Sequence, residues 1–531
     1  MQAALDAHWR SAQAHLRTGN AMAAIADCEA IVAMDPRQPS VWLMLARLAQ
    51  GSGRFRVVVE KARMAAAAVH ESRDWAPLAD IAMLLQGMGE SRLAARAIID
   101  ADWNAPQILG AADRLAQCLG LADCHDDALR LLDCALAVRA PTPMLSYMRA
   151  MTLRHLGRST EATSEYQRCL ALAPDYAAAM LMLATHDRRA DTKAQIARIR
   201  HALASERLDA TNTSMLHYAL FTHLDGADDV DVAWQALMRG AAIKRRSLAW
   251  QPRQDEARDA AIMALCRAPF LAAARSVSAE QVPIFIVGQP RTGTTVLERI
   301  LGNHSQVASA GELDDFHLQL CWQADILSGE LAHPALLQAC PTLDFAAVGR
   351  GYLQRTTWRA RGRRFLIDKL PNNLFYAGLI HKALPQARIV CLLRDPLDTC
   401  LSNLKELFAG DAYPYSYDPL EAAAHHLRVR RLLRHWDEVM PGVVLTVRYE
   451  DMVRDPSSAA RAVMDHCGLA FEPGCVDLLR NAAPSATASS SQVRQPLHTR
   501  GIGAWRRYAE PLAGARALLE AHLPADAFAA D

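Results

Sequence analysis

The hydrophobic pattern changes character about halfway along the chain. Up to about residue 247, alanine, leucine and arginine dominate, glycine and proline stand only at spaced points, and the apolar spacing is helical. After residue 280, short apolar runs rich in β-branched residues alternate with helical patterns, and such runs are typical of buried parallel strands. The sequence therefore predicts an α-helical solenoid followed by an α/β domain with a parallel sheet and helices on both faces. The predicted strands are 284–287, 365–369, 388–393 and 443–449.

The first half contains an internal repeat. Gly19, Gly53 and Gly87 recur every 34 residues, which is the tetratricopeptide period, although Gly89 competes with Gly87 for the third turn. Small residues let the two helices of a repeat cross closely, and a proline ends the second helix. The alternative is an alanine-rich bundle without repeat order. The repeat is favoured over this bundle because the same offsets separate Gly19, Ala24 and Pro36, and again Gly157, Ala162 and Pro174.

A strand, a glycine-bearing turn and a helix follow one another at 282–301. Gly288 and Gly293 allow the backbone to approach an anion, and the start of the helix directs unpaired N–H groups at it. The spacing is close to that of the nucleotide-triphosphate loop, but Thr294 stands where that loop has lysine, and the cation is Arg291. Such a loop is poorly built for ATP or GTP. It suits a 5′-phosphate with one further anionic group. The alternative interpretation is an ordinary turn between a strand and a helix, without a ligand.

The segment Pro-Arg-Thr-Gly-Thr-Thr after an apolar strand resembles the 5′-phosphosulfate loop of sulfotransferases that use 3′-phosphoadenosine 5′-phosphosulfate (PAPS). The resemblance is closest to the tyrosylprotein sulfotransferase branch and its bacterial relatives with tetratricopeptide repeats, and it covers about residues 280–515. It implies PAPS as donor, 3′-phosphoadenosine 5′-phosphate (PAP) as product, an acceptor hydroxyl and no metal. It also implies that the loop residues Gln289, Pro290, Arg291, Thr292, Gly293, Thr294 and Thr295 bind the cofactor.

The resemblance also implies the catalytic residues. Glu312 matches the family's general base, which takes the proton of the acceptor, although a single acidic residue stands here where the family has two. Lys369, at the end of a predicted strand, matches the catalytic lysine, and Arg291 assists it. His304 also invites attention as a base, but it lies too near the end of the loop helix, and we interpret it as structural.

Further motifs match the rest of the cofactor site. Arg394 and Ser402, eight residues apart, match the pair that grips the 3′-phosphate, and a guanidinium and a hydroxyl suit that task. Tyr449 stands where relatives place an aromatic residue beside adenine. The match weakens in the C-terminal segment that closes over the cofactor, because Ala504 replaces the family's lysine. The candidates in that segment are Ser489, Arg494 and Arg500, with Arg506 as a further substitute for the lysine.

Length and composition set the outline. With 531 residues, the chain divides into a helical array at 1–247, a junction at 248–279 and a sulfotransferase-like domain at 280–531. A net charge of +1 provides no global field for nucleic acid or an anionic membrane. Twelve cysteines without a C-x-x-C pair favour reduced thiols, and no apolar run is long enough for a membrane span. We therefore expect a cytoplasmic protein.

The acceptor stays open at this stage. Six arginines between residues 350 and 364 form either a solvated helix face or a basic rim for acidic acceptors. Together with a helical array of the kind that binds peptides, they favour a protein tyrosine over a saccharide, a lipid or a small phenol. The array could instead hold a protein partner, form a homodimer or act as a spacer. Other classes of function are a tetratricopeptide adaptor with an inactive transferase domain and a nucleotide kinase or NTPase.

Overall fold

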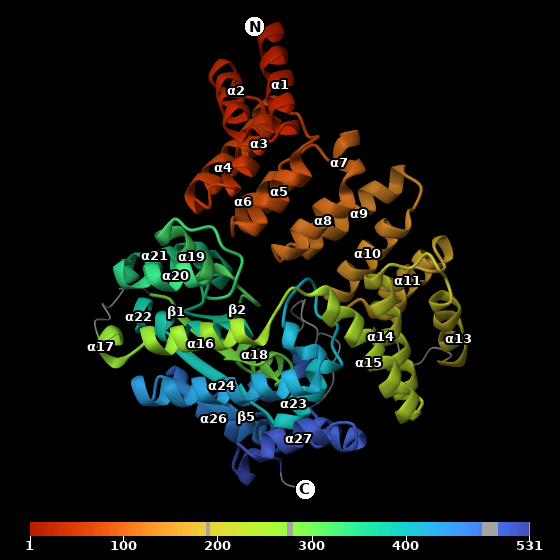
Figure 1. Cartoon of the computed structure of the whole chain (residues 1–531), viewed down its shortest axis with the longest axis vertical. Helices are drawn as coiled ribbons and strands as arrows, with labels where there is room; N and C mark the ends of the chain where they lie inside the picture. Colours follow the sequence, from red (N-terminus) through yellow and green to blue (C-terminus); the bar gives the residue numbers. More distant parts are fainter. Residues whose placement is uncertain (187–191, 273–279, 481–496, 530–531) are drawn as a thin grey trace. The chain divides into compact units, whose positions relative to one another are not determined.

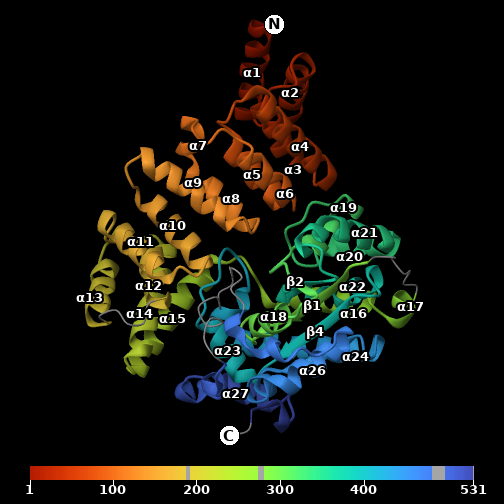
Figure 2. The ribbon, with the colours of Figure 1, turned by 180° about the vertical axis from the view of Figure 1, so that it is seen from behind.

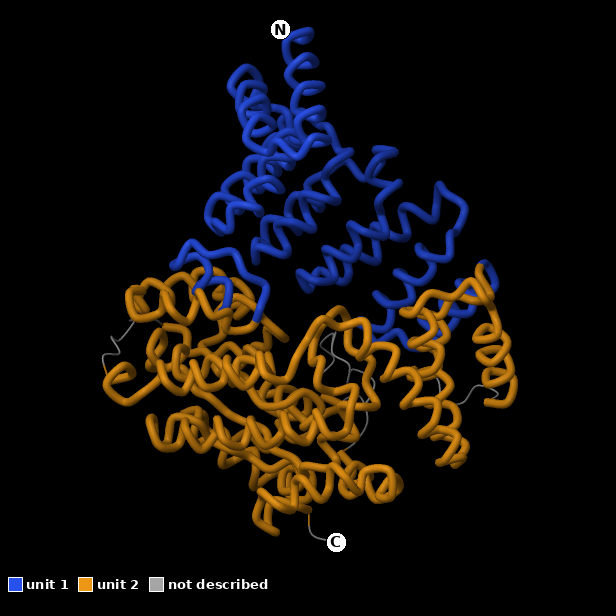
Figure 3. Tube along the Cα trace, in the orientation of Figure 1, with its two compact units in different colours: residues 1–172, 317–330 blue, residues 173–316, 331–531 orange. Residues whose placement is uncertain are grey.

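The computed structural model describes residues 1–186, 192–272, 280–480 and 497–529. The chain forms two compact units, Met1–Leu172 with His317–Glu330, and Ala173–Phe316 with Leu331–Asp531 (Figure 3). The sequence-based division places the end of the helical array at residue 247. In the structure, the helices that follow residue 172 are grouped with the sheet.

The first unit is a series of helix pairs, in which α1 packs on α2, α3 on α4, α5 on α6, α8 on α9 and α10 on α11 (Figure 1). Turns with positive φ at Gly19, Gly53, Gly89 and Gly157 separate the helices of four of these pairs. Gly87 is the last residue of α5 and Gly89 has the positive φ, so Gly89 is the third turn, which the sequence left as the alternative. The helices are α1 (Gln2–Arg17), α2 (Ala21–Met34), α3 (Pro39–Gln50), α4 (Phe55–Ser72), α5 (Leu78–Gly87), α6 (Ser91–Ile99), α7 (Pro106–Gly110), α8 (Ala112–Leu121), α9 (His125–Val138), α10 (Pro143–His155) and α11 (Ser159–Leu172).

A segment from far along the chain completes this unit. Helix α19 (Asp315–Ala324) ends in a turn at which the carboxylate of Asp325 accepts the backbone N–H of Arg56 at 2.9 Å and pairs with the guanidinium of Arg54 at 3.0 Å. Arg54 precedes α4 and provides no capping side chain of its own. The N–H of Leu327 then bonds to the carbonyl of Gly53 at 2.7 Å. Asp325 therefore serves as the N-cap of a helix about 270 residues earlier in the chain.

The second unit begins with helices that the sequence assigns to the array. Tyr218 is buried and donates its hydroxyl to the carbonyl of Leu404 at 3.1 Å, and Arg245 pairs with Glu421 at 2.7 Å. These contacts make the helices part of the fold that carries the sheet. They are α12 (Ala177–His186), α13 (Thr192–Leu203), α14 (Ala210–Gly226), α15 (Val230–Ser247), α16 (Pro252–Leu265) and α17 (Ala268–Leu271).

The sheet is parallel in all its pairings, as predicted, with the strand order β2-β3-β1-β4-β5. Side chains of β1 alternate between two cores: Ile284 packs against helices including α18, whereas Phe285 contacts Phe316 and Tyr352. Both faces are therefore covered by helices, and α18 lies beside β1 in both views (Figure 1, Figure 2). The strands are β1 (Val282–Gly288), β2 (Val307–Ser309), β3 (Phe365–Asp368), β4 (Arg388–Leu393) and β5 (Val444–Arg448).

The order of the strands locates the functional end of the sheet. The chain moves from β1 to one side to form β2 and β3 and to the other side to form β4 and β5. Ligands of such sheets bind beyond the carboxyl ends of the strands where the direction reverses, which here is between β1 and β4. The helices are α18 (Thr294–Gly302), α20 (Pro334–Ala339), α21 (Phe345–Thr356), α22 (Ala377–Ala383), α23 (Pro396–Leu404), α24 (Pro419–Val439), α25 (Tyr449–Arg454), α26 (Pro456–Cys467) and α27 (Ala513–Glu520). Within the described ranges, no helix combines the length and the apolar character needed to cross a membrane.

Candidate functional site

The loop between β1 and α18 has the conformation expected of a phosphate cradle. Gly293 has φ +100° and is the N-cap of α18, and a Cβ at this position would lie 2.5 Å from Cδ2 of Tyr449. At Gly288, with φ +142°, a Cβ would lie 2.7 Å from the carbonyl oxygen of Leu392. Both positions therefore require glycine. Because Gly293 has no side chain with which to cap α18, the start of this helix is suited to an anion.

Two side chains from the β4–α23 region hold the loop in place. The side-chain amide of Asn403 donates to the carbonyl of Pro290 at 3.0 Å, and the guanidinium of Arg394 donates to the carbonyl of Arg291 at 3.1 Å. Arg291 itself lies with its guanidinium 3.8 Å from the carboxylate of Glu406. The loop conformation is thus set by residues more than 100 positions away, as well as by its own sequence.

Arg394 also joins the loop to the C-terminal segment. Its guanidinium donates to the carbonyl of Gly501 at 2.5 Å and lies 4.8 Å from the ring centroid of Tyr449. Its Nε atom is buried and has no partner among the described residues. The carboxylate of Asp398 on α23 accepts the backbone N–H groups of Gly503 and Trp505 at 2.7 and 2.9 Å, so the C-terminal segment is tied to the same helix.

The other candidates for the cofactor site lie in different surroundings. Ser402 is half-buried on α23, and Arg500 is exposed just before Gly501. Gln289 is buried, and its Oε1 atom has no partner among the described residues. Ser489 and Arg494 lie outside the described residues.

The predicted base and the predicted catalytic lysine come together at the end of β3. Lys369 is 1% exposed, and its ammonium group forms an ion pair with the carboxylate of Glu312, whose side chain is 44% exposed. The backbone N–H of Lys369 donates to the carbonyl of Gly311 at 2.8 Å, which holds the turn of Glu312 against the strand. A buried cation and a partly exposed carboxylate are therefore in direct contact.

A second carboxylate, absent from the sequence-based site, completes this group. Oε2 of Glu298 on α18 lies 3.9 Å from the ammonium of Lys369, and Oε1 accepts the hydroxyl of Ser309 at 2.5 Å. Burial raises the pKa of Glu298, and the charge of Lys369 opposes this rise. The sequence carries no signal for this role, because a charged residue on a helix usually marks a solvated face.

A buried hydrogen-bonded pair, Asp368 and Tyr352, stabilises the same end of β3. Asp368 is fully buried and accepts the hydroxyl of Tyr352 at 2.9 Å. Burial raises the pKa of the Asp368 carboxyl well above its ordinary value, and this hydrogen bond opposes the rise. The pair fixes β3 next to Lys369 from the side of α21.

His304 has the surroundings of a structural residue. Its side chain is 2% exposed, Nε2 lies 2.9 Å from the carbonyl of Ala470, and Nδ1 accepts the backbone N–H of Gln306 at 3.0 Å. Both ring nitrogens are therefore engaged: Nε2 joins the end of α18 to the segment after α26, and Nδ1 stabilises the local turn after α18.

Half of the arginine run serves the fold. Arg355 pairs with Asp315 at 3.2 Å, Arg359 is buried, and Arg363 donates to the carbonyl of Val307. Arg363 is nevertheless exposed, as are Arg350, Arg361 and Arg364. Arg359 is therefore unavailable to a basic rim, and four members of the run stay exposed.

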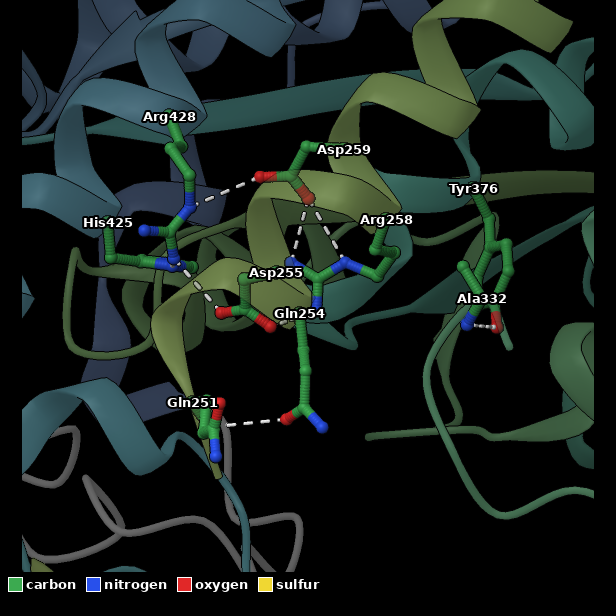
Figure 4. Close-up of polar contacts among 9 residues, drawn as sticks. All are labelled: Gln251, Gln254, Asp255, Arg258, Asp259, Ala332, Tyr376, His425 and Arg428. Atoms are coloured by element: carbon green, nitrogen blue, oxygen red, sulfur yellow. Dashed lines mark hydrogen bonds and ion pairs between the residues drawn. The ribbon is translucent and has the colours of Figure 1, made fainter. Parts of the chain in front are cut away.

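A buried charge network braces the segment between α23 and α24. On α16, Asp255 and Asp259 both contact Arg258 at 2.8 Å, and Arg428 of α24 lies 3.0 Å from Asp255 and 3.3 Å from Asp259 (Figure 4). His425, which Arg428 contacts at 2.9 Å, stacks on Tyr415 with 3.5 Å between ring centroids. Two arginines and two aspartates balance in charge, as buried ions require.

Across the described ranges, no group of three or more His, Cys, Asp or Glu side chains could hold a metal ion.

Residues 283–473 match the model of the sulfotransferase family, so this part of the chain is a sulfotransferase-family domain. An uncharacterized protein of Aquifex aeolicus (strain VF5) is 31% identical over 234 residues, which cover 43% of this chain and 30% of that protein. A putative protein-tyrosine sulfotransferase of Caenorhabditis briggsae is 21% identical over 42% of this chain and 80% of that protein. The solved sulfotransferase domain of the Synechococcus PCC 7002 olefin synthase is 20% identical over 47% of this chain and 99% of that domain, with a TM-score of 0.34. The chain thus spans less than a third of the Aquifex protein.

Proposed function

We propose that the chain transfers a sulfuryl group from PAPS to an acceptor hydroxyl. The observation that carries this proposal is the meeting of Lys369 with Glu312 and with Glu298 of the loop helix, at the carboxyl end of β3 beside β1. The helix that begins at the loop thereby lies next to a buried cation and a partly exposed base. The loop departs from the nucleotide-triphosphate pattern, because Thr294 stands in place of lysine, and this departure disfavours a kinase or an NTPase.

The residues present fit PAPS. Two buried polar atoms, Oε1 of Gln289 and Nε of Arg394, lack partners among the described residues, and the glycines of the loop leave the backbone open to an anion. PAPS supplies a sulfuryl group attached to a 5′-phosphate. The start of α18 and the loop from Gln289 to Thr295 would hold that phosphate, while Arg394 and Ser402 would hold the 3′-phosphate. Tyr449 and Arg500 would lie along the nucleotide, and we extend this role to Ser489 and Arg494.

Proton removal falls to Glu312. Its carboxylate is the partly exposed member of the Lys369 group, so an acceptor hydroxyl can approach it and lose its proton to it. Lys369 and Arg291 supply positive charge where negative charge develops during transfer. In the structure Lys369 pairs with Glu312, and the base is free to act once the ammonium turns to an anionic ligand.

We propose a protein tyrosine as the acceptor. The likeness to a putative protein-tyrosine sulfotransferase and a helical array of a kind that binds peptides support this choice. The array would present the protein acceptor. The exposed Arg350, Arg361, Arg363 and Arg364 provide part of the attraction for acidic sequences that six arginines would give.

Calorimetry and turnover test the proposal together. PAP should bind more tightly than AMP, because a hydrogen bond to a charged group is worth about 1.5–3 kcal/mol, or roughly ten- to a hundredfold in affinity. Glu312→Ala should lose about 10²–10⁴-fold in turnover with labelled PAPS and a tyrosine peptide while it still binds PAP. Equal affinity of the wild-type chain for PAP and AMP would contradict the assignment of the nucleotide. Label that appears only on saccharides or lipids of a lysate would contradict the assignment of the acceptor.

A further inference from the structure

The carboxylate of Glu298 lies where three structural elements meet. It belongs to α18, the helix that begins at the phosphate loop, and it contacts the hydroxyl of Ser309 at the end of β2 and the ammonium of Lys369 after β3. Its side chain is 12% exposed. One group on a rigid helix thus contacts both segments from which the proposed catalytic side chains extend.

The contact with Ser309 reaches the turn of the proposed base. The oxygen of Ser309 that donates to Glu298 accepts the backbone N–H of Gly311 at 3.2 Å, and Gly311, with φ +70°, directly precedes Glu312. The carbonyl of Gly311 accepts the N–H of Lys369. Glu298, Ser309 and Gly311 therefore form a hydrogen-bonded chain from α18 to the base, and the ion pair of Glu298 with Lys369 closes it.

The charges in direct contact with Lys369 do not balance its own. Two carboxylates, Glu298 and Glu312, face the single ammonium of Lys369, and Arg299 of α18 is the further cation that acts on Glu298. When both carboxylates are ionised, little of the positive charge of Lys369 is available to an anionic ligand. An ionised Glu298 would keep that charge partly neutralised even after Glu312 separates from the ammonium.

We propose that Glu298 is a positioning residue of the proposed sulfuryl transfer, which holds Lys369 and the turn of Glu312 together and whose charge weakens the attraction of Lys369 for the nucleotide. This inference rests on the proposed function. It separates two effects. The hydrogen bond of Glu298 serves turnover, whereas its negative charge opposes the binding of PAP.

Two substitutions in the full-length chain separate these effects. Glu298→Gln keeps an oxygen for the hydroxyl of Ser309 but removes the charge, so PAP should bind about three- to thirtyfold more tightly, the order expected for removal of one nearby charge. Ser309→Ala keeps the charge but leaves the N–H of Gly311 without its acceptor, so kcat should fall about tenfold while PAP affinity stays the same. A tighter complex is a result that a merely structural role of Glu298 would not produce. The matched control is Asp465→Asn, which removes one negative charge from an exposed position on α26 and should leave PAP affinity unchanged.

The pH dependence gives a second measurement. Because burial raises the pKa of Glu298, the carboxyl is neutral below that raised value and charged above it, with Lys369, Glu312, Arg299 and Ser309 as the groups that face it. The ratio of the PAP affinities of Glu298→Gln and wild type should therefore be near one at low pH and rise as pH rises. Ionisation of the phosphates of PAP cancels in this ratio.

The results distinguish the two levels of the proposal. A wild-type chain that does not bind PAP contradicts the proposed function, and this inference with it. A wild-type chain that binds PAP, combined with a Glu298→Gln variant of equal affinity at every pH, overturns the inference alone. An Asp465→Asn variant that gains as much affinity as Glu298→Gln would also overturn it, because the gain would then reflect net charge.

Discussion

Substitution of Asp325 should loosen the start of α4, although the two lie in distant parts of the sequence. Asp325→Ala removes the acceptor of the Arg56 N–H at 2.9 Å and the ion pair with Arg54 at 3.0 Å. The residue that precedes α4 has no capping bond of its own, so no local group takes over. The first turn of the helix would then leave an N–H group to water.

The size of the effect follows from these contacts. Loss of an N-cap typically costs about 0.5–2 kcal/mol. The side chains of Arg54 and Arg56 are 63% and 53% exposed, so their ion pairs with Asp325 add only about 0.2–1 kcal/mol. The total is about 1–3 kcal/mol. At roughly 1.4 kcal/mol for each tenfold change, the amides of α4 should exchange their hydrogens about five- to a hundredfold faster.

Hydrogen exchange of the full-length chain, followed by mass spectrometry, measures this directly. Asp325→Asn keeps an oxygen for the cap and loses the charge, so it should show a smaller effect than Asp325→Ala. Asp35→Ala is a matched control, since Asp35 has an equally buried side chain but makes local contacts, with Arg37 and Gln38. Exchange in α4 that is unchanged in Asp325→Ala would refute the capping argument, and an Asn variant as fast as the Ala variant would assign the effect to charge.

Three further substitutions test the second unit. Gly293→Ala should abolish PAP binding in calorimetry, because its Cβ would have to lie 2.5 Å from a ring carbon of Tyr449. The control is Gly468→Ala, where φ is +76° but no atom lies within 4 Å of the added Cβ. This control should bind PAP normally and lose only about 1–3 kcal/mol of stability. His304→Ala should keep its turnover, but its free energy of unfolding in denaturant should fall by about 1–3 kcal/mol, because both ring nitrogens of His304 bond to the backbone. A well-folded but inactive variant would make His304 part of the chemistry. Asp225→Ala should speed hydrogen exchange at residues 499–508. It removes the carboxylate that accepts the hydroxyl of Tyr508 at 2.6 Å and the guanidinium of Arg507 at 2.9 Å. Unchanged exchange there would show that other contacts hold the segment.

Features with local causes could be predicted from the sequence. The strand, loop and helix at 282–302 follow from an apolar β-branched run and from glycines at turns, and the structure places Gly293 at φ +100°. The repeat turns at Gly19, Gly53 and Gly157 follow from the same steric rule. The parallel sheet was predictable because short buried strands alternate with helices. The roles of Glu312, Lys369 and Arg394 came from a resemblance and stay predictions.

Contacts between residues far apart in sequence could not be predicted, because they depend on the order of the strands. The order β2-β3-β1 places Glu298, Ser309 and Lys369 together, although they lie on three separate elements. Packing between distant segments likewise groups residues 317–330 with the first helices and the helices after residue 172 with the sheet. In each case the sequence determined which local structures form, through sterics and apolar spacing. The tertiary structure decided which of their side chains meet, because burial against a distant element, and not the local pattern, sets the surroundings of a charged group.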